Sequence, residues 1–206
     1  MPELAVSNDR VAAAPREPLD FTRRMRALCQ DMAARVPDAL GHVAMSRVAV
    51  SLRQTRNASS CGVYATLTPL RFPGGQLVTV RRGRQWHMPR LYDPDGREQL
   101  YLLNFYLPRF LDLDLPHKLR TTVHELWHVS PQFDGDLRRF AGRCQAHGSS
   151  RKRFDAHADE LVARWLAAGP PEHLYAFLQH DFPTLLAQHG RIVGTKIRTP
   201  RLVRGE

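Results

Sequence analysis

The stretch His124-Glu125-Leu126-Trp127-His128 fits the pattern H-E-x-x-H. Residues four apart on a helix lie one turn above each other, so both imidazoles can point at a single ion. Neutral imidazole binds Zn²⁺ at about 2.0–2.1 Å, and a glutamate beside the first histidine can reach a water on the metal without being a ligand. About 0.02 such matches are expected by chance in a chain of this length and composition. The pattern therefore predicts a zinc site, with His124 and His128 as ligands and Glu125 as the catalytic base.

A catalytic zinc site also needs a third protein ligand and an open position for water. The extended metzincin pattern is absent, because Pro131 stands where that pattern requires glycine and no histidine follows at the required distance. The candidates lie further along the chain: His147 before the next predicted helix, or an acidic residue on that helix. Projected at 100° per residue, Asp155 and Asp159 flank the apolar stripe of this helix, whereas Glu160 falls on its solvent side.

The sequence around the motif resembles a family of zincin-like metallopeptidases found in phages, bacteria and archaea. The resemblance covers roughly residues 44–165, and its most specific part is the run H-E-x-x-H, Pro-x-Phe-Asp-Gly and then His-Gly. It implies His124, His128 and His147 as zinc ligands, with Glu125 as the catalytic residue. It gives no substrate, and the arginine-rich C-terminus lies outside it.

These residues favour a zinc-dependent metallopeptidase that acts on a peptide or protein substrate. Zinc would lower the pKa of a bound water toward 7 and polarise the scissile carbonyl group, while Glu125 takes the proton and later delivers it to the leaving amine. Arg138 and Arg139 follow the motif and could bind a substrate carboxylate, although a solvated loop is the simpler interpretation. Trp127 is expected to belong to the hydrophobic core.

Periodic patterns indicate the elements that position the motif. Asp20 can cap a helix whose apolar residues recur from Phe21 to Val36 before Pro37, and Asp114 can cap the helix that carries the motif. Ser150 can cap a helix with one apolar side, and shorter helices are expected around 172–180 and 183–189. Between about 43 and 107 the spacing of the apolar residues changes to the alternation typical of strands. We expect these strands to pair with their sequence neighbours, mostly in antiparallel fashion.

The expected fold class is α+β and zincin-like, with a small, mostly antiparallel sheet packed on the H-E-x-x-H helix and further C-terminal helices. We expect a flexible N-terminal arm over residues 1–18, a single domain over 19–190 and a basic C-terminal tail over 191–206.

The charge distribution suggests a second hypothesis. The chain has a formal net charge of +10, with the surplus concentrated in residues 41–100 and in the C-terminal tail. Such a surplus favours polyanions, so the alternative is a nucleic-acid-associated protein with a structural or inactive zinc site. Arginine is strongly preferred over lysine, however, and this bias can also reflect codon composition. Weak nucleic-acid contact through the arginine-rich surface is thus a partner hypothesis beside the peptide substrate.

Other features exclude several protein classes. Cys29, Cys61 and Cys144 form no C-x-x-C pair and are too scattered for a disulfide framework, so we expect free thiols. No run approaches the roughly 18 apolar residues of a membrane span. The first residues lack the basic and apolar regions of a signal peptide, which leads us to expect a cytoplasmic protein without membrane contact.

Overall fold

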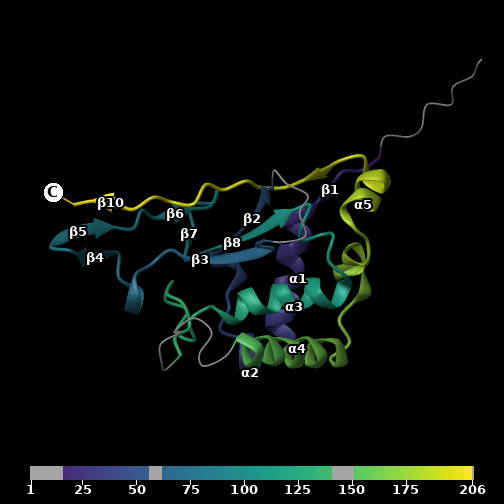
Figure 1. Ribbon diagram of the computed structural model, residues 1–206, viewed down its shortest axis with the longest axis horizontal. Helices are drawn as coiled ribbons and strands as arrows, with labels where there is room; N and C mark the ends of the chain where they lie inside the picture. Colours follow the sequence, from purple (N-terminus) through teal and green to yellow (C-terminus); the bar gives the residue numbers. More distant parts are fainter. Residues whose placement is uncertain (1–15, 56–61, 141–150, 206) are drawn as a thin grey trace, which may run out of the picture.

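The computed structural model describes residues 16–55, 62–140 and 151–205, and it has an α+β architecture. In Figure 1 a central sheet lies above the helices α3 and α4, and a second group of strands extends to the left. The α-helices are α1 Phe21–Arg35, α2 Pro37–Leu40, α3 Leu115–Trp127, α4 Arg151–Ala167 and α5 Phe182–His189. The strands are β1 Leu19–Asp20, β2 Val48–Gln54, β3 Ala65–Pro69, β4 Val78–Arg81, β5 Arg84–His87, β6 Leu91–Tyr92, β7 Glu98–Gln99, β8 Tyr101–Leu107, β9 Ile192–Val193 and β10 Val203–Arg204.

The central sheet has the strand order β2-β8-β3. β3 and β8 are antiparallel, but β2 and β8 are parallel and pair Val48 with Tyr101. The expectation that sequence neighbours pair is therefore wrong at the centre of the sheet. Both β2 and β8 are buried along almost their whole length, as is typical of parallel strands that are covered on both faces. Antiparallel pairing does predominate among the smaller sheets, where β4–β5, β5–β10 and β6–β7 are antiparallel and β1–β9 is parallel.

The C-terminal segment covers one edge of the central sheet. Leu52 of β2 donates its N–H to the carbonyl oxygen of Thr195 at 2.9 Å, and Ile197 donates its N–H to the Ser51 hydroxyl at 3.0 Å. Residues 191–205 thus lie against the rest of the chain, along the top of Figure 1. The opposite edge of the sheet is β3, which faces helix α3. Because the C-terminal segment covers the β2 edge, β3 is the edge that lies next to the helix with the H-E-x-x-H motif.

The helices begin where capping side chains satisfy their first backbone N–H groups. The carboxylate of Asp20 accepts from Arg23 N at 3.0 Å, and that of Asp114 accepts from His117 N at 2.8 Å, so both predicted caps are confirmed. Ser150, the third predicted cap, lies outside the described residues. The predicted helix around 172–180 is instead two short 3₁₀ helices, Glu172–Leu174 and Ala176–Gln179.

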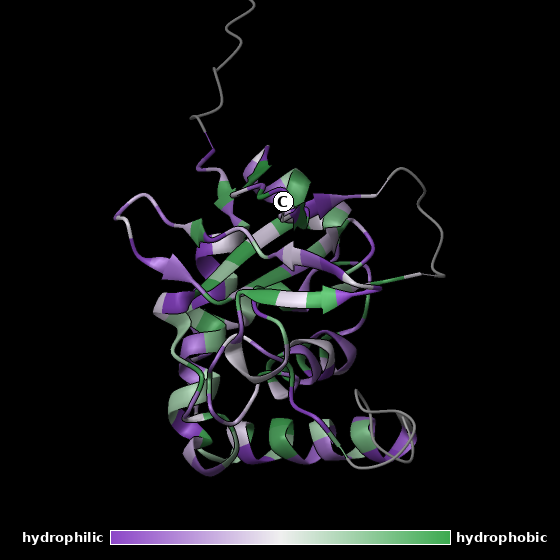
Figure 2. Ribbon diagram, turned by 90° about the vertical axis from the view of Figure 1, so that its left-hand side faces the viewer, coloured by the Kyte–Doolittle hydropathy of each residue, from purple (hydrophilic) through white to green (hydrophobic). Residues whose placement is uncertain are grey.

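One continuous hydrophobic core joins the sheet to α1, α3 and α4. Its largest fully buried side chains include Trp165, Tyr101, Phe21 and Phe105. The predicted apolar stripe of α4 is buried, and in Figure 2 the helices show hydrophobic and hydrophilic bands in turn. Among the described residues, no helix is both long and apolar enough to cross a membrane. Cys29 lies in this core as a free thiol, and burial raises its pKa to about 12.

Candidate metal centre and catalytic cleft

Helix α3 presents both motif histidines on one side. The helix ends at Trp127, but His128 keeps right-handed helical dihedrals (φ −71°, ψ −15°), so the four-residue spacing still places the two imidazoles one turn apart. Their ring centroids are 4.9 Å apart. Two imidazoles that share one tetrahedral zinc at about 2.0–2.1 Å have centroids about 5 Å apart. The donor types and the ring spacing therefore fit a zinc ion.

Helix α4 packs its first turns against these imidazoles. The ring of Phe154 lies 4.6 Å from that of His124 and 4.7 Å from that of His128, which it stacks at 24°. The carboxylate of Asp155 lies 3.0 Å from Nδ1 of His124. A carboxylate at Nδ1 fixes the ring and leaves Nε2 as the nitrogen available to a metal. Asp155 is thus placed to orient the imidazole of His124 and not to act as a metal ligand itself.

The other ligand candidates are placed differently. Asp159 forms an ion pair with Arg120 of α3 and is largely exposed, and Glu160 is exposed as expected. His147 lies outside the described residues, so its assignment stays a prediction. Within residues 16–55, 62–140 and 151–205, no three His, Cys, Asp or Glu side chains form a metal-binding group. The described residues therefore bring together two imidazoles and one carboxylate that contacts the first of them.

Glu125 points from α3 to the open edge of the sheet. Its Oε2 accepts the backbone N–H of Leu67 in β3 at 2.7 Å. Burial raises the pKa of Glu125 to about 7, although the Leu67 N–H favours the ionised form and acts in the opposite direction. A general base is most effective when its pKa lies near the working pH, so this carboxyl group suits proton transfer. The backbone partner could not be identified from the sequence, because it lies 58 residues away.

A cleft of about 340 Å³ opens between α3 and the start of β3. Its walls include His124, Glu125 and Asp155, with Tyr64 and Ala65 from the strand side and Arg120 from the helix. Tyr64, His117 and Arg120 were not among the predicted site residues. The positions of Arg120 and His117, four and seven residues before His124 on the same helix, could have indicated them, whereas Tyr64 lies 60 residues away. The cleft therefore combines the proposed general base with the start of β3, the outer strand of the central sheet.

The loop after the motif is tightly built. Gly135 adopts φ +89°, and a Cβ atom there would lie 2.5 Å from Cγ of Arg71, so this turn requires glycine. The hydroxyl of Tyr101 donates to the carbonyl oxygen of Asp136 at 2.8 Å and accepts from the N–H of Gly135 at 3.0 Å. This loop thereby anchors the end of α3 on the central sheet.

The two arginines of this loop have intramolecular partners. Arg138 donates to the carbonyl oxygen of Trp127 at 2.8 Å, and its guanidinium carbon lies 3.6 Å from the centre of the Trp127 ring. Arg139 forms an ion pair with Asp136 at 2.9 Å. Trp127 itself is partly buried against the core, as expected. These contacts favour a structural role for both arginines over substrate binding.

Comparison of the chain with models of protein families, with curated proteins and with solved structures finds no match in any of the three.

Proposed function

We propose that this protein is a zinc-dependent peptidase with a zincin-like fold. The observation that carries the proposal is the junction of α3 and β3, where Glu125 lies beside the paired imidazoles and bonds the open edge of the sheet. His124 and His128 would hold the ion, and His147 is the proposed third ligand. Zinc, when bound, lowers the pKa of a coordinated water and polarises a carbonyl group.

The residues of the chain account for the remaining requirements of peptide hydrolysis. Glu125 accepts a proton at its carboxylate and returns it to the leaving amine, and the Leu67 N–H holds that carboxylate in place. Asp155 holds the ring of His124. The aromatic ring of Phe154 shields one side of both imidazoles from water.

The edge of β3 provides a way to align the substrate. Tyr64 directs its carbonyl oxygen at β8, where it accepts from Tyr106 N at 2.9 Å, and Leu67 directs its N–H away from β8. Because backbone direction alternates along a strand, the polar groups of Ala65 face the same open side as Leu67. Because Glu125 occupies the Leu67 N–H, an extended peptide would pair as a further strand with the polar groups of Ala65, and its scissile bond would lie beside Glu125.

Metal analysis of the purified full chain tests the first step. We expect near-stoichiometric zinc, or zinc uptake after removal with a chelator, and cleavage of a fluorescence-quenched casein substrate that stops with the chelator and returns with zinc. His147→Ala should lose most of the zinc, because two protein ligands hold the ion poorly. A chain that neither contains nor takes up zinc would overturn the proposal, and full zinc in His147→Ala would overturn the ligand assignment.

A further inference from the structure

The three-stranded sheet β10-β5-β4, which we call the wing, has two chemically different faces. Its register places Thr79, Trp86 and Arg204 in one row, and Arg81 opposite Arg84 two positions along. Side chains two positions apart lie on the same face of a sheet, so these rows form one arginine–tryptophan face. The intervening rows place exposed valines on the opposite face (Val78, Val80 and Val203).

Two distant basic segments meet in the wing. Residues 76–90 contain four arginines and no acidic residue, and residues 191–205 contain four arginines and one lysine, again without an acidic residue. The pairing of β10 with β5 brings the second segment onto the first, to the left of Figure 1 and away from the cleft beside α3. The hairpin tip is also basic, because Arg82 and Gly83 form its turn with φ values of +52° and +72°.

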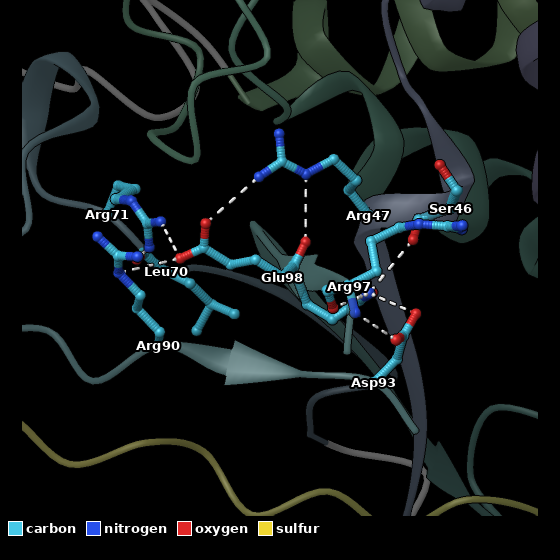
Figure 3. Close-up of polar contacts among 9 residues, drawn as sticks. Ser46, Arg47, Leu70, Arg71, Arg90, Asp93, Arg97 and Glu98 are labelled. Carbon is cyan, nitrogen blue, oxygen red and sulfur yellow. Dashed lines mark hydrogen bonds and ion pairs between the residues drawn. The ribbon is translucent and has the colours of Figure 1, made fainter. Parts of the chain in front are cut away.

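The carboxylates that follow the hairpin are already engaged. Glu98 lies within ion-pair distance of three arginines, namely Arg47 and Arg90 at 3.5 Å and the buried Arg71 (Figure 3). Asp93 accepts from the backbone N–H of Arg97 at 2.8 Å and from the side chain of Gln99 at 3.1 Å. Neither carboxylate pairs with an arginine of β4, β5 or β10, and these three strands contain no acidic residue.

Two hollows on this basic surface each combine arginines with an aromatic ring. One, of about 630 Å³, is lined by Arg81, Arg82, Arg84, Trp86 and Leu202. The other, of about 740 Å³, is lined by Arg53, Tyr106, Arg198, Thr199 and Arg201. Both include residues of the C-terminal segment, and at most about 14 Å of extended chain separates Arg198 from Leu202. The two hollows are therefore close enough for one short linear ligand to reach both.

We propose that the arginine–tryptophan face of the wing and the adjoining C-terminal segment bind single-stranded nucleic acid. Guanidinium groups contact phosphates through two parallel hydrogen bonds, and a partly exposed tryptophan offers a platform on which an unpaired base stacks. A duplex keeps its bases stacked on each other and would use only the charges. The aromatic ring within each hollow is the reason to favour a single strand.

The test uses the full chain and fluorescein-labelled oligonucleotides, dT15 and U15, with anisotropy measured from 50 to 200 mM salt. Arg84→Gln combined with Arg204→Gln removes two exposed charges of the face. The slope of log K against log salt should fall by about 1.4, because each lost phosphate contact contributes about 0.7 for single strands. Arg23→Gln combined with Lys152→Gln removes two exposed charges from α1 and α4, and should leave the slope unchanged.

Stacking has its own variants. Trp86→Leu should weaken binding about fivefold or more, whereas Trp86→Phe should retain most of the affinity. Circular dichroism checks that each variant is folded. If Trp86→Leu does not fold, the double variant of Arg84 and Arg204 still tests the proposal. Binding of either dT15 or U15 with these effects supports the proposal.

Three outcomes would overturn it: no binding of either oligonucleotide at 50 mM salt, an equal loss of slope in the control pair, or binding only to duplex DNA or to phosphatidylserine vesicles.

Discussion

Glu125 is the residue on which the proposed chemistry depends. Glu125→Gln keeps the size of the side chain and its acceptor oxygen for the Leu67 N–H, but an amide cannot take a proton from water. We expect zinc content to stay at the level of the unmodified chain while peptide cleavage falls by about 10²- to 10⁴-fold. Metal analysis and the casein assay on the same preparation measure both quantities. Cleavage at an undiminished rate would show that Glu125 is not the general base.

A substitution of Asp155 tests whether this carboxylate orients His124 or binds zinc directly. Because its carboxylate meets Nδ1 of His124, Asp155→Ala should weaken zinc affinity by about 10- to 100-fold while zinc still binds. Asp159→Ala removes a carboxylate of the same helix that pairs with Arg120, and should leave the affinity unchanged. Competition with a chromogenic chelator measures both. Complete loss of zinc from Asp155→Ala would identify Asp155 as a ligand and contradict its orienting role.

At the scale of the elements, a buried lysine joins α3 to the 3₁₀ helix Ala176–Gln179. Lys118 is only 1% exposed. Its ammonium group donates to the carbonyl oxygens of Leu178 at 2.9 Å and His180 at 2.8 Å. Burial lowers the pKa of Lys118, while the carboxylates of Asp181, Asp112 and Asp114 act in the opposite direction. The contact fixes α3 to the C-terminal part of the chain.

Lys118→Met fills the same space but leaves both carbonyl oxygens without their donor. We expect the free energy of unfolding to fall by about 1–3 kcal/mol. Urea denaturation measures the change, and Lys152→Met, at an exposed position of α4, provides the control with little effect. Equal stability of the two variants would mean that water replaces the lysine at these carbonyl groups.

For the whole molecule, Asp136 makes the stability of the folded state depend on pH. It connects the loop after α3 to the turn before β4, because its carboxylate pairs with Arg139 at 2.9 Å and accepts from Gly74 N at 3.3 Å. Burial by itself raises the pKa of Asp136, but hydrogen bonds from Arg139 and from backbone N–H groups outweigh burial, and the pKa lies below its ordinary value. The ionised carboxylate therefore stabilises the folded state.

Because the folded-state pKa is lowered, this stabilisation is fully present above about pH 4, the ordinary aspartate value, and is lost as pH falls through the lower folded-state pKa. Asp136→Asn should consequently lower the urea midpoint more at pH 6 than at pH 2.5. Asp95→Asn, at an exposed turn, should show no such pH dependence. A difference between Asp136→Asn and the unmodified chain that is the same at both pH values would refute the link.

The sequence by itself determined the local features of this protein. The caps at Asp20 and Asp114 and the spacing of His124 and His128 each involve interactions within a few residues. Local hydrogen bonds and helical periodicity are sufficient to specify such features. The α+β class follows from the same patterns.

Only the tertiary structure decided which distant segments meet. The parallel pairing of β2 with β8 joins residues about fifty positions apart, the Leu67 N–H reaches Glu125 across 58 positions, and β10 completes a sheet begun by β4 and β5. Each of these contacts forms because several elements bury their apolar faces together, and strand propensity does not specify a distant partner. The local sequence thus specifies the helix with the H-E-x-x-H motif, whereas the strand edge beside it and the arginine–tryptophan face of the wing arise from the packing of the whole chain.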